Sequence, residues 1–149
     1  MKHLIISVAT AMAISGCATP SQMSADVEVT RLCAIDGGIK VYETVKLPAE
    51  RFDKWGNVHI PPKDKASDLG EFYFERDQIN LVVGDPHVIR TIHKIIRRSD
   101  GKVLGTSTRY GRGGGDIPGP WYPSSFMCPE VSKDKPSLES LIFVKGEAK

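Results

Sequence analysis

Alternation of apolar and polar residues marks the clearest elements of this chain. In 39–45 (Ile-Lys-Val-Tyr-Glu-Thr-Val) β-branched residues recur on one side, which is the pattern of a half-buried strand. Residues 71–75 (Glu-Phe-Tyr-Phe-Glu) are rich in aromatic side chains and predict a second strand. Proline, serine and charged residues fill 60–70, so we expect a loop before the second strand.

The segment 88–97 fits two interpretations. Its apolar positions lie on one face of a helix, for which Asp85 and Pro86 would serve as the N-cap and the first residue. However, six of these ten residues are β-branched, and Ser-Asp-Gly-Lys at 99–102 is a tight-turn sequence that leads to a further β-branched stretch at 103–110. We predict a β-hairpin, with the helix as the alternative.

Two segments favour helices. Residues 26–35 stop at Asp-Gly-Gly, which is either a helix end or a turn, and we expect a helix there. Residues 49–55 lie between a proline and a glycine and fit two turns of helix. Phe52 and Trp55, three positions apart, would then face the core.

The C-terminal part offers less regular structure. Glycine and proline in 112–123 require a loop, and 137–144 provides a last short element. About 130 residues are enough for one modest core. We therefore predict a single α+β domain over 27–149, built from a small antiparallel β-sheet with one or two short helices against it.

The N-terminus carries a separate signal. Met1-Lys2-His3 precedes an apolar run from Leu4 to Ile14, which is too short to span a membrane and is typical of a secretory signal peptide. The run closes with Ile14-Ser15-Gly16-Cys17, which resembles the lipobox of bacterial lipoproteins. Residues 1–16 would be the lipoprotein signal peptide. The alternative is an ordinary secreted protein in which Cys17 lies by chance beside the cleavage site.

The lipoprotein resemblance implies covalent lipid on Cys17, which becomes the first residue of the mature protein. Two or three palmitate-type acyl chains hold a domain on a bilayer essentially permanently. In that class, Ala18 in place of Asp at the second position implies the outer membrane of a Gram-negative bacterium, where we expect the domain to face the periplasm. The following residues are small and polar, so we predict a lipidated, flexible tether over 17–26.

Two cysteines remain in the mature chain, Cys33 and Cys128. Export would place both in an oxidising compartment, where paired thiols persist as disulfides. We therefore predict a structural Cys33–Cys128 bridge. A redox-active thiol pair and a metal site are the alternatives, but neither cysteine belongs to a CxxC motif or has a histidine nearby.

Charge is segregated along the chain, although the formal net charge is only +2. Between positions 90 and 112 seven cations face a single acid, Asp100. One hypothesis is an anion-binding hairpin for lipid phosphate, an envelope polymer or, less expected, nucleic acid. Its candidate residues are Arg90, Lys94, Arg98, Lys102, Arg109 and Arg112. The favoured interpretation is a solvated sheet face whose cations meet Glu71, Glu75 and Asp77 on a neighbouring strand.

Two loops invite functional interpretations. The glycines of 111–116 resemble a phosphate loop, but Ile-Pro-Gly-Pro follows where a helix should begin, so a flexible connection is expected. Trp121 and Tyr122 could form an exposed contact loop. We expect them instead to fold back on the core beside Cys128.

No catalytic or metal-binding motif is present in the sequence. His59, His87 and His93 lack the spacing of metal ligands, and no serine or cysteine lies in a nucleophile motif. We expect a non-enzymatic protein without a cofactor other than its lipid. Its role would be that of a lipid-tethered envelope domain that binds or scaffolds another envelope component; the alternative is an anion-binding module built on the 90–112 hairpin.

Overall fold

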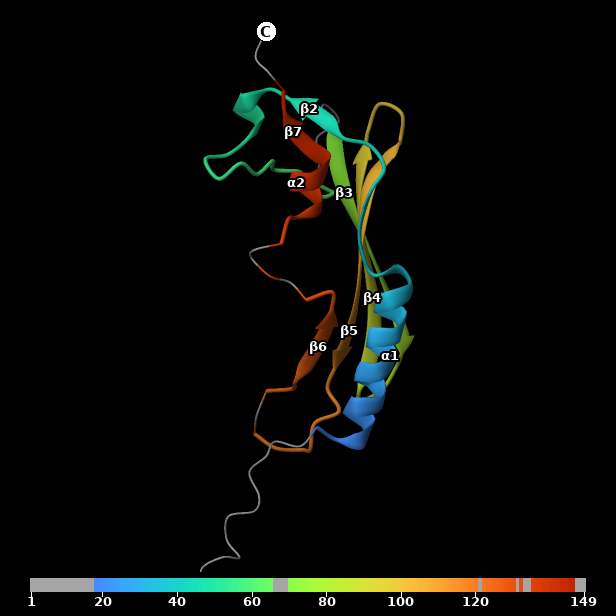
Figure 1. The fold of residues 1–149 in the computed structure, drawn as a ribbon. Coiled ribbons are helices and arrows are strands. Elements are labelled where there is room, and N and C mark those ends of the chain that lie inside the picture. Colours follow the sequence, from blue (N-terminus) through green and yellow to red (C-terminus); the bar gives the residue numbers. More distant parts are fainter. Residues whose placement is uncertain (1–17, 66–69, 121, 131, 133–134, 147–149) are drawn as a thin grey trace, which may run out of the picture.

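The computed structural model describes residues 18–65, 70–120, 122–130, 132 and 135–146. An antiparallel sheet forms its centre, with strands in the order β1-β5-β4-β3 and with β6 paired to β5 on the β1 side (Figure 1). The strands are β1 (Gly38–Val41), β3 (Phe72–Val82), β4 (His87–Arg97), β5 (Val103–Gly113) and β6 (Ser125–Cys128). This arrangement confirms the α+β class.

Helices cover the two faces of the sheet at opposite ends. Helix α1 (Pro20–Asp36) packs over β5, β4 and β6 at one end. At the other end, the opposite face lies under α2 (Leu138–Ile142) and a small parallel sheet of β2 (Val45–Leu47) and β7 (Phe143–Lys145). The 3-10 turn η1 (Ala49–Arg51) follows β2 along the chain. Each face is therefore partly covered and partly open.

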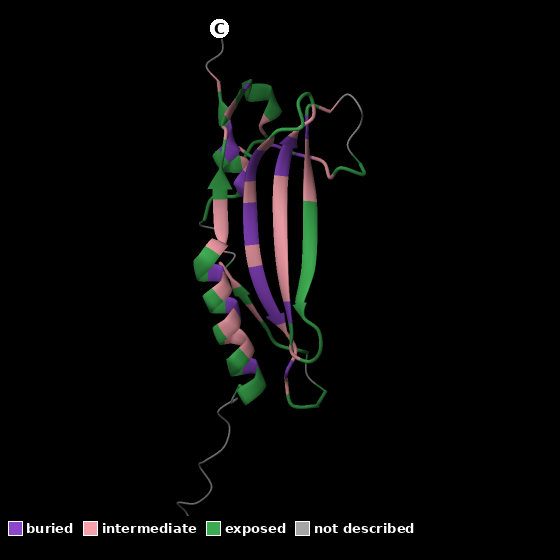
Figure 2. Ribbon diagram, turned by 90° about the vertical axis from the view of Figure 1, so that its right-hand side faces the viewer, coloured by how far each residue is buried: buried purple, intermediate pink, exposed green. Residues whose placement is uncertain are grey.

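Two apolar clusters correspond to these two coverings. Under α1, Val29 and Cys33 pack with Val88 and Tyr110. Under α2, the second cluster joins the sheet to the small sheet; its buried members are Leu47, Val58, Ile60, Phe72, Ile95, Leu104, Leu138, Ile142 and Phe143. Burial falls from β5, at the centre, to the edge strand β3, whose second half is exposed (Figure 2).

The predicted hairpin is confirmed. Strands β4 and β5 pair antiparallel from His87–Gly113 to Ile96–Val103, joined by the turn that contains Gly101 at φ +69°. The strand predicted at 71–75 is also present but continues to Val82. Its extension shows no apolar alternation because it lies at the edge of the sheet, where both faces are exposed.

The strand predicted at 39–45 is wrong in its second half. Strand β1 ends at Val41, and Val45 begins a different sheet. The amides of Tyr42 and Glu43 both donate to the carbonyl of Leu104, at 2.8 and 3.1 Å. Because two successive amides converge on one acceptor, the ladder cannot continue and the chain turns away from β5.

The two-turn helix predicted at 49–55 is also wrong. Only η1 forms, and Phe52 instead bridges Val58. The carboxylate of Asp53 accepts hydrogen bonds from the amides of Trp55 and Asn57, a local arrangement that competes with a helix. Trp55 is consequently 74% exposed rather than in the core.

The predicted tether is corrected by the position at which α1 begins. Thr19 caps the helix through a capping box with Gln22, and Pro20 occupies the first helical position. Residues 20–26 therefore belong to the folded domain, and the helix expected at 26–35 is longer than predicted. Cys17 and the signal segment lie outside the described residues. Among the described residues, no helix is long and apolar enough to cross a membrane.

The predicted disulfide is confirmed. Cys33, in the last turn of α1, bonds to Cys128 at the end of β6, with the Cα atoms 5.9 Å apart. The bridge links residues 95 positions apart in sequence. It fixes the helix to the strand that borders β5.

Candidate anion-binding site

Most of the cations predicted to bind an anion are held by acids of the protein itself. Beneath α1, Arg90 forms an ion pair with Asp36, which also accepts a hydrogen bond of 2.6 Å from the Tyr110 hydroxyl. Arg112 forms an ion pair with Asp26 at 2.8 Å, and its side chain is only 6% exposed. Both guanidinium groups therefore already have a carboxylate partner within the protein.

Three further cations are engaged elsewhere. Lys94 pairs with Asp77 at 2.6 Å across β3 and β4, as the solvated-face interpretation predicted. Lys102 pairs with Glu43, whose pKa is lowered by hydrogen bonds from Arg97 and Lys102. Arg98 donates to the carbonyl of Gly70 and lies over the ring of Tyr73.

The other two acids named by that interpretation have different partners. Glu75 pairs with Lys63 at 2.6 Å, and Glu71 lies 3.8 Å from Arg51. The 90–112 hairpin is therefore largely neutralised, partly by residues that sequence reasoning did not connect with it.

Arg109 differs from the other candidates because it lies on the opposite face of the sheet, away from α1. Strand register places six polar residues in two adjacent rows on this face, which we call the polar rows. They are Arg76, His93 and Ser107 in one row, and Gln78, Thr91 and Arg109 in the next. No ion pair joins Arg76 or Arg109 to any acid within the part of the chain that the structure describes.

His93 occupies the middle of the polar rows. Its Nε2 accepts a hydrogen bond of 2.7 Å from Arg76, and its ring stacks on Phe74 with centroids 6.2 Å apart. Burial, followed by the positive charges of Arg76 and Arg109, lowers the pKa of His93. The imidazole is therefore held neutral between two guanidinium groups.

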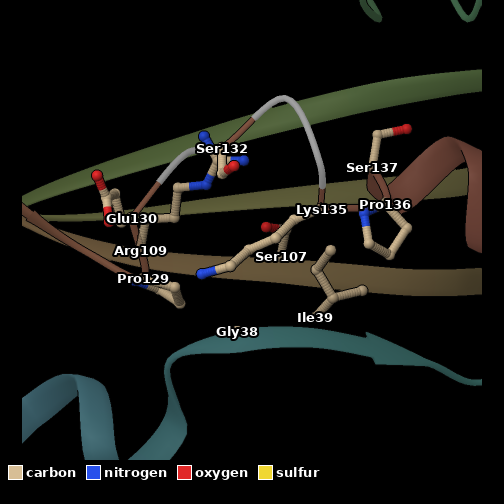
Figure 3. A pocket seen from close by; sticks show the side chains of 10 residues that line it. All are labelled: Gly38, Ile39, Ser107, Arg109, Pro129, Glu130, Ser132, Lys135, Pro136 and Ser137. Atoms are coloured by element: carbon tan, nitrogen blue, oxygen red, sulfur yellow. The ribbon is translucent and has the colours of Figure 1, made fainter.

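A cavity of about 170 Å³ lies beside the polar rows. Its floor is formed by Gly38, Ile39, Ser107 and Arg109, and its roof by residues of the 129–137 segment (Figure 3). Lys135 extends from this segment toward Pro129, and Arg109 rises from the floor toward Ser132 (Figure 3). Glu130 also lines the cavity, so its described lining carries two cations and one acid.

Sequence reasoning found only one of the three cations of this site. Arg76 and Lys135 lie outside 90–112, and the fold alone brings them to the face that holds Arg109. The only signal in the sequence was the alternation of β3, which places Arg76 on the side opposite Asp77.

The two loops considered as binding sites, the one with Tyr122 and the glycine-rich one at 111–116, lie in different surroundings. Tyr122 is 96% exposed, which corrects the expectation that it covers the core, whereas Trp121 lies outside the described residues. In the glycine-rich loop, Asp85 accepts a hydrogen bond from the amide of Gly115, and Asp116 accepts one of 2.7 Å from the amide of Ser124. Acids of the protein thus occupy amides that a phosphate would need.

The chain was compared with protein families, curated proteins and solved structures. No protein-family model, no curated protein and no solved structure matches this chain. Among the described residues, no group of three or more His, Cys, Asp or Glu side chains could hold a metal ion.

Proposed function

We propose that this protein is a lipid-anchored binding protein of the cell envelope that holds an anionic envelope component against the polar rows. The lipobox supports the anchor. The anion site is supported by Arg76 and Arg109, which lie on the open part of one face, and by Lys135, which lines the cavity beside Arg109. None of the three has an ion pair to a described acid. This proposal relocates the anion-binding hypothesis from the 90–112 hairpin to the face away from α1.

The arrangement of Arg76, His93 and Arg109 carries the proposal. Two guanidinium groups without an ion pair to a described acid flank a neutral imidazole, to which Arg76 donates a hydrogen bond, and they leave positive charge on this part of the face. An anion with several oxygen acceptors would satisfy both guanidinium groups and offset their repulsion. Ser107 and the cavity beside it provide room for part of such a ligand.

The test is a titration of the protein with inorganic phosphate, followed through the ring signals of His93 by NMR. A bound anion neutralises the charges that lower the pKa of His93, so the pKa should rise as phosphate saturates. We expect R109Q to weaken phosphate binding at least several-fold and added salt to weaken it further.

Lys40→Gln is the matched control. Lys40 is exposed on β1 and pairs with Thr106, the neighbour of Ser107. It therefore lies on the face of the sheet opposite Ser107. It should bind phosphate as the unmodified protein does. Equal affinities for K40Q and R109Q, or no response of His93 to phosphate, would contradict the proposed site.

A further inference from the structure

One end of the molecule is almost free of charge. It is formed by the start of α1, the β3–β4 connection and the loop after β5, which meet at the bottom of Figure 1. Segments 18–25, 81–86, 113–120 and 122–127 supply it, and they contain no lysine or arginine and only two acids, Asp85 and Asp116. Both carboxylates accept hydrogen bonds from backbone amides of this end.

Large apolar side chains project from this end into solvent. Val83 is 86% exposed, Ile117 63%, Met23 59% and Tyr122 96%. Several exposed apolar side chains without cations at one end are unusual on a protein whose full chain carries 20 basic and 18 acidic residues. An aromatic side chain with a polar tip beside aliphatic ones is the composition that proteins place at a membrane–water interface.

The same end holds the chain directly after Cys17. The hydroxyl of Thr19 donates to the carbonyl of Gly115 at 2.7 Å, and Gln22 donates to Asp116 and Ser124 at 2.9 Å each. Only Ala18 separates Thr19 from Cys17. Two residues span at most about 7 Å, so acyl chains on Cys17 would hold this end against the bilayer surface.

We propose that this end, which we call the apolar end, is a membrane-contact surface and that the domain stands upright on the bilayer. The inference rests on the proposed lipid anchor and adds an orientation to it. Val83, Ile117 and Tyr122 enter the interfacial region, while the turn at 99–102 points away. The polar rows then stand clear of the lipid.

The test uses the full lipidated protein in vesicles of phosphatidylethanolamine and phosphatidylglycerol, with a nitroxide-labelled lipid as quencher. Val83→Cys and Ser99→Cys each receive an environment-sensitive fluorophore. These positions lie in turns at opposite ends of β4, roughly 35 Å apart along an 11-residue strand. We expect blue-shifted emission and several-fold stronger quenching at position 83 than at position 99.

A second probe keeps the test independent of one substitution. Gly119→Cys lies in the exposed loop of the apolar end and should be quenched as Val83→Cys is. Equal quenching at both ends, in protein that floats with the vesicles and has the mass of the acylated form, would overturn the orientation alone. Protein that fails to float and lacks the acyl mass would overturn the proposed anchor instead.

Discussion

Arg112 is the side chain that ties α1 to the sheet most directly. Its guanidinium donates to both carboxylate oxygens of Asp26 and to the carbonyls of Gly114 and Ser124. It thereby joins a helix, the end of β5 and the loop after it. Because the Arg112 side chain is almost fully buried, its removal leaves these acceptors without their donor and opens a space beneath α1.

Substitution R112A should destabilise the fold by about 2 to 4 kcal/mol, since it leaves the carboxylate and carbonyl acceptors without a partner. Chemical unfolding followed by circular dichroism measures the loss. The matched control is R31A, which removes a solvent-exposed ion pair with Glu28 on the same helix and should leave the free energy of unfolding nearly unchanged. Similar losses in the two variants would contradict the structural role given to Arg112.

The lowered pKa of His93 predicts how the free energy of unfolding depends on pH. Its pKa in the folded state lies below the ordinary value of about 6.5, because burial and the nearby guanidinium groups disfavour the imidazolium. As pH falls through 6.5, the unfolded chain takes up a proton and the folded one does not, so stability declines until the folded pKa is reached. H93Q should flatten this decline between pH 6.5 and the folded pKa; an unchanged slope would contradict it.

At the scale of elements, the hairpin of β4 and β5 could be predicted because local signals agree. Its β-branched residues, its Asp-Gly turn and its returning strand all favour the same structure. Helix α1 was predicted only in part, since its buried positions are Gln22, Val29 and Cys33. Because Gln22 is polar but buried, the apolar residues of α1 do not recur with a clear helical period. Its hydrogen-bond partners, Asp116 and Ser124, lie more than 90 positions away in the sequence.

The candidate site could be predicted less well than the fold. The sequence groups seven cations within 90–112, but the folded structure decides which acids they meet, and α1 contributes Asp26 and Asp36 to two of the ion pairs. Arg98 is held by the carbonyl of Gly70, which leaves Arg109 as the candidate without a described partner. Arg76 and Lys135, which belong to the same proposed site, come from segments outside 90–112. Pairing across strands, which no local pattern specifies, decided which cations were left without acids.

The loop after β5 has a glycine that no other residue can replace cheaply. Gly114 lies at φ +75°, and a Cβ there would overlap the carboxylate of Asp85. That carboxylate accepts the hydrogen bond from the Gly115 amide. The position therefore combines a backbone requirement with a steric one.

Substitution G114A should cost about 2 to 3 kcal/mol, because the left-handed backbone is strained and Asp85 must leave its amide. Gly101 provides the comparison. It has a similar φ of +69° but open space around it, so G101A should cost only about 1 kcal/mol. Thermal unfolding of both variants tests the difference, and a larger loss for G101A would contradict the Asp85 contact.

At the scale of the whole molecule, the two apolar clusters lie on opposite faces and near opposite ends of one sheet. Long-range links hold the parts together, and the Cys33–Cys128 bridge is the covalent one. In the chain-entropy model, a bridge between residues 95 apart stabilises the folded state by about 4 to 5 kcal/mol.

The double variant C33A/C128A should therefore lose most of the stability of a domain this size. Unfolding midpoints in urea, compared with those of the reduced unmodified protein, measure this loss. Both samples should be destabilised to a similar degree. A free energy of unfolding within about 0.5 kcal/mol of that of the oxidised protein would show that packing of α1 alone is sufficient.

If the proposed export takes place, the position of this bridge bears on how the chain crosses a membrane. In a reducing compartment the Cys33 and Cys128 thiols stay unbonded, so α1 has no covalent link to β6 and the domain lacks its main long-range link. A chain without that link is less stable and passes more easily through a membrane channel in the unfolded state. Oxidation after the crossing would then complete the fold and oppose a return through the channel.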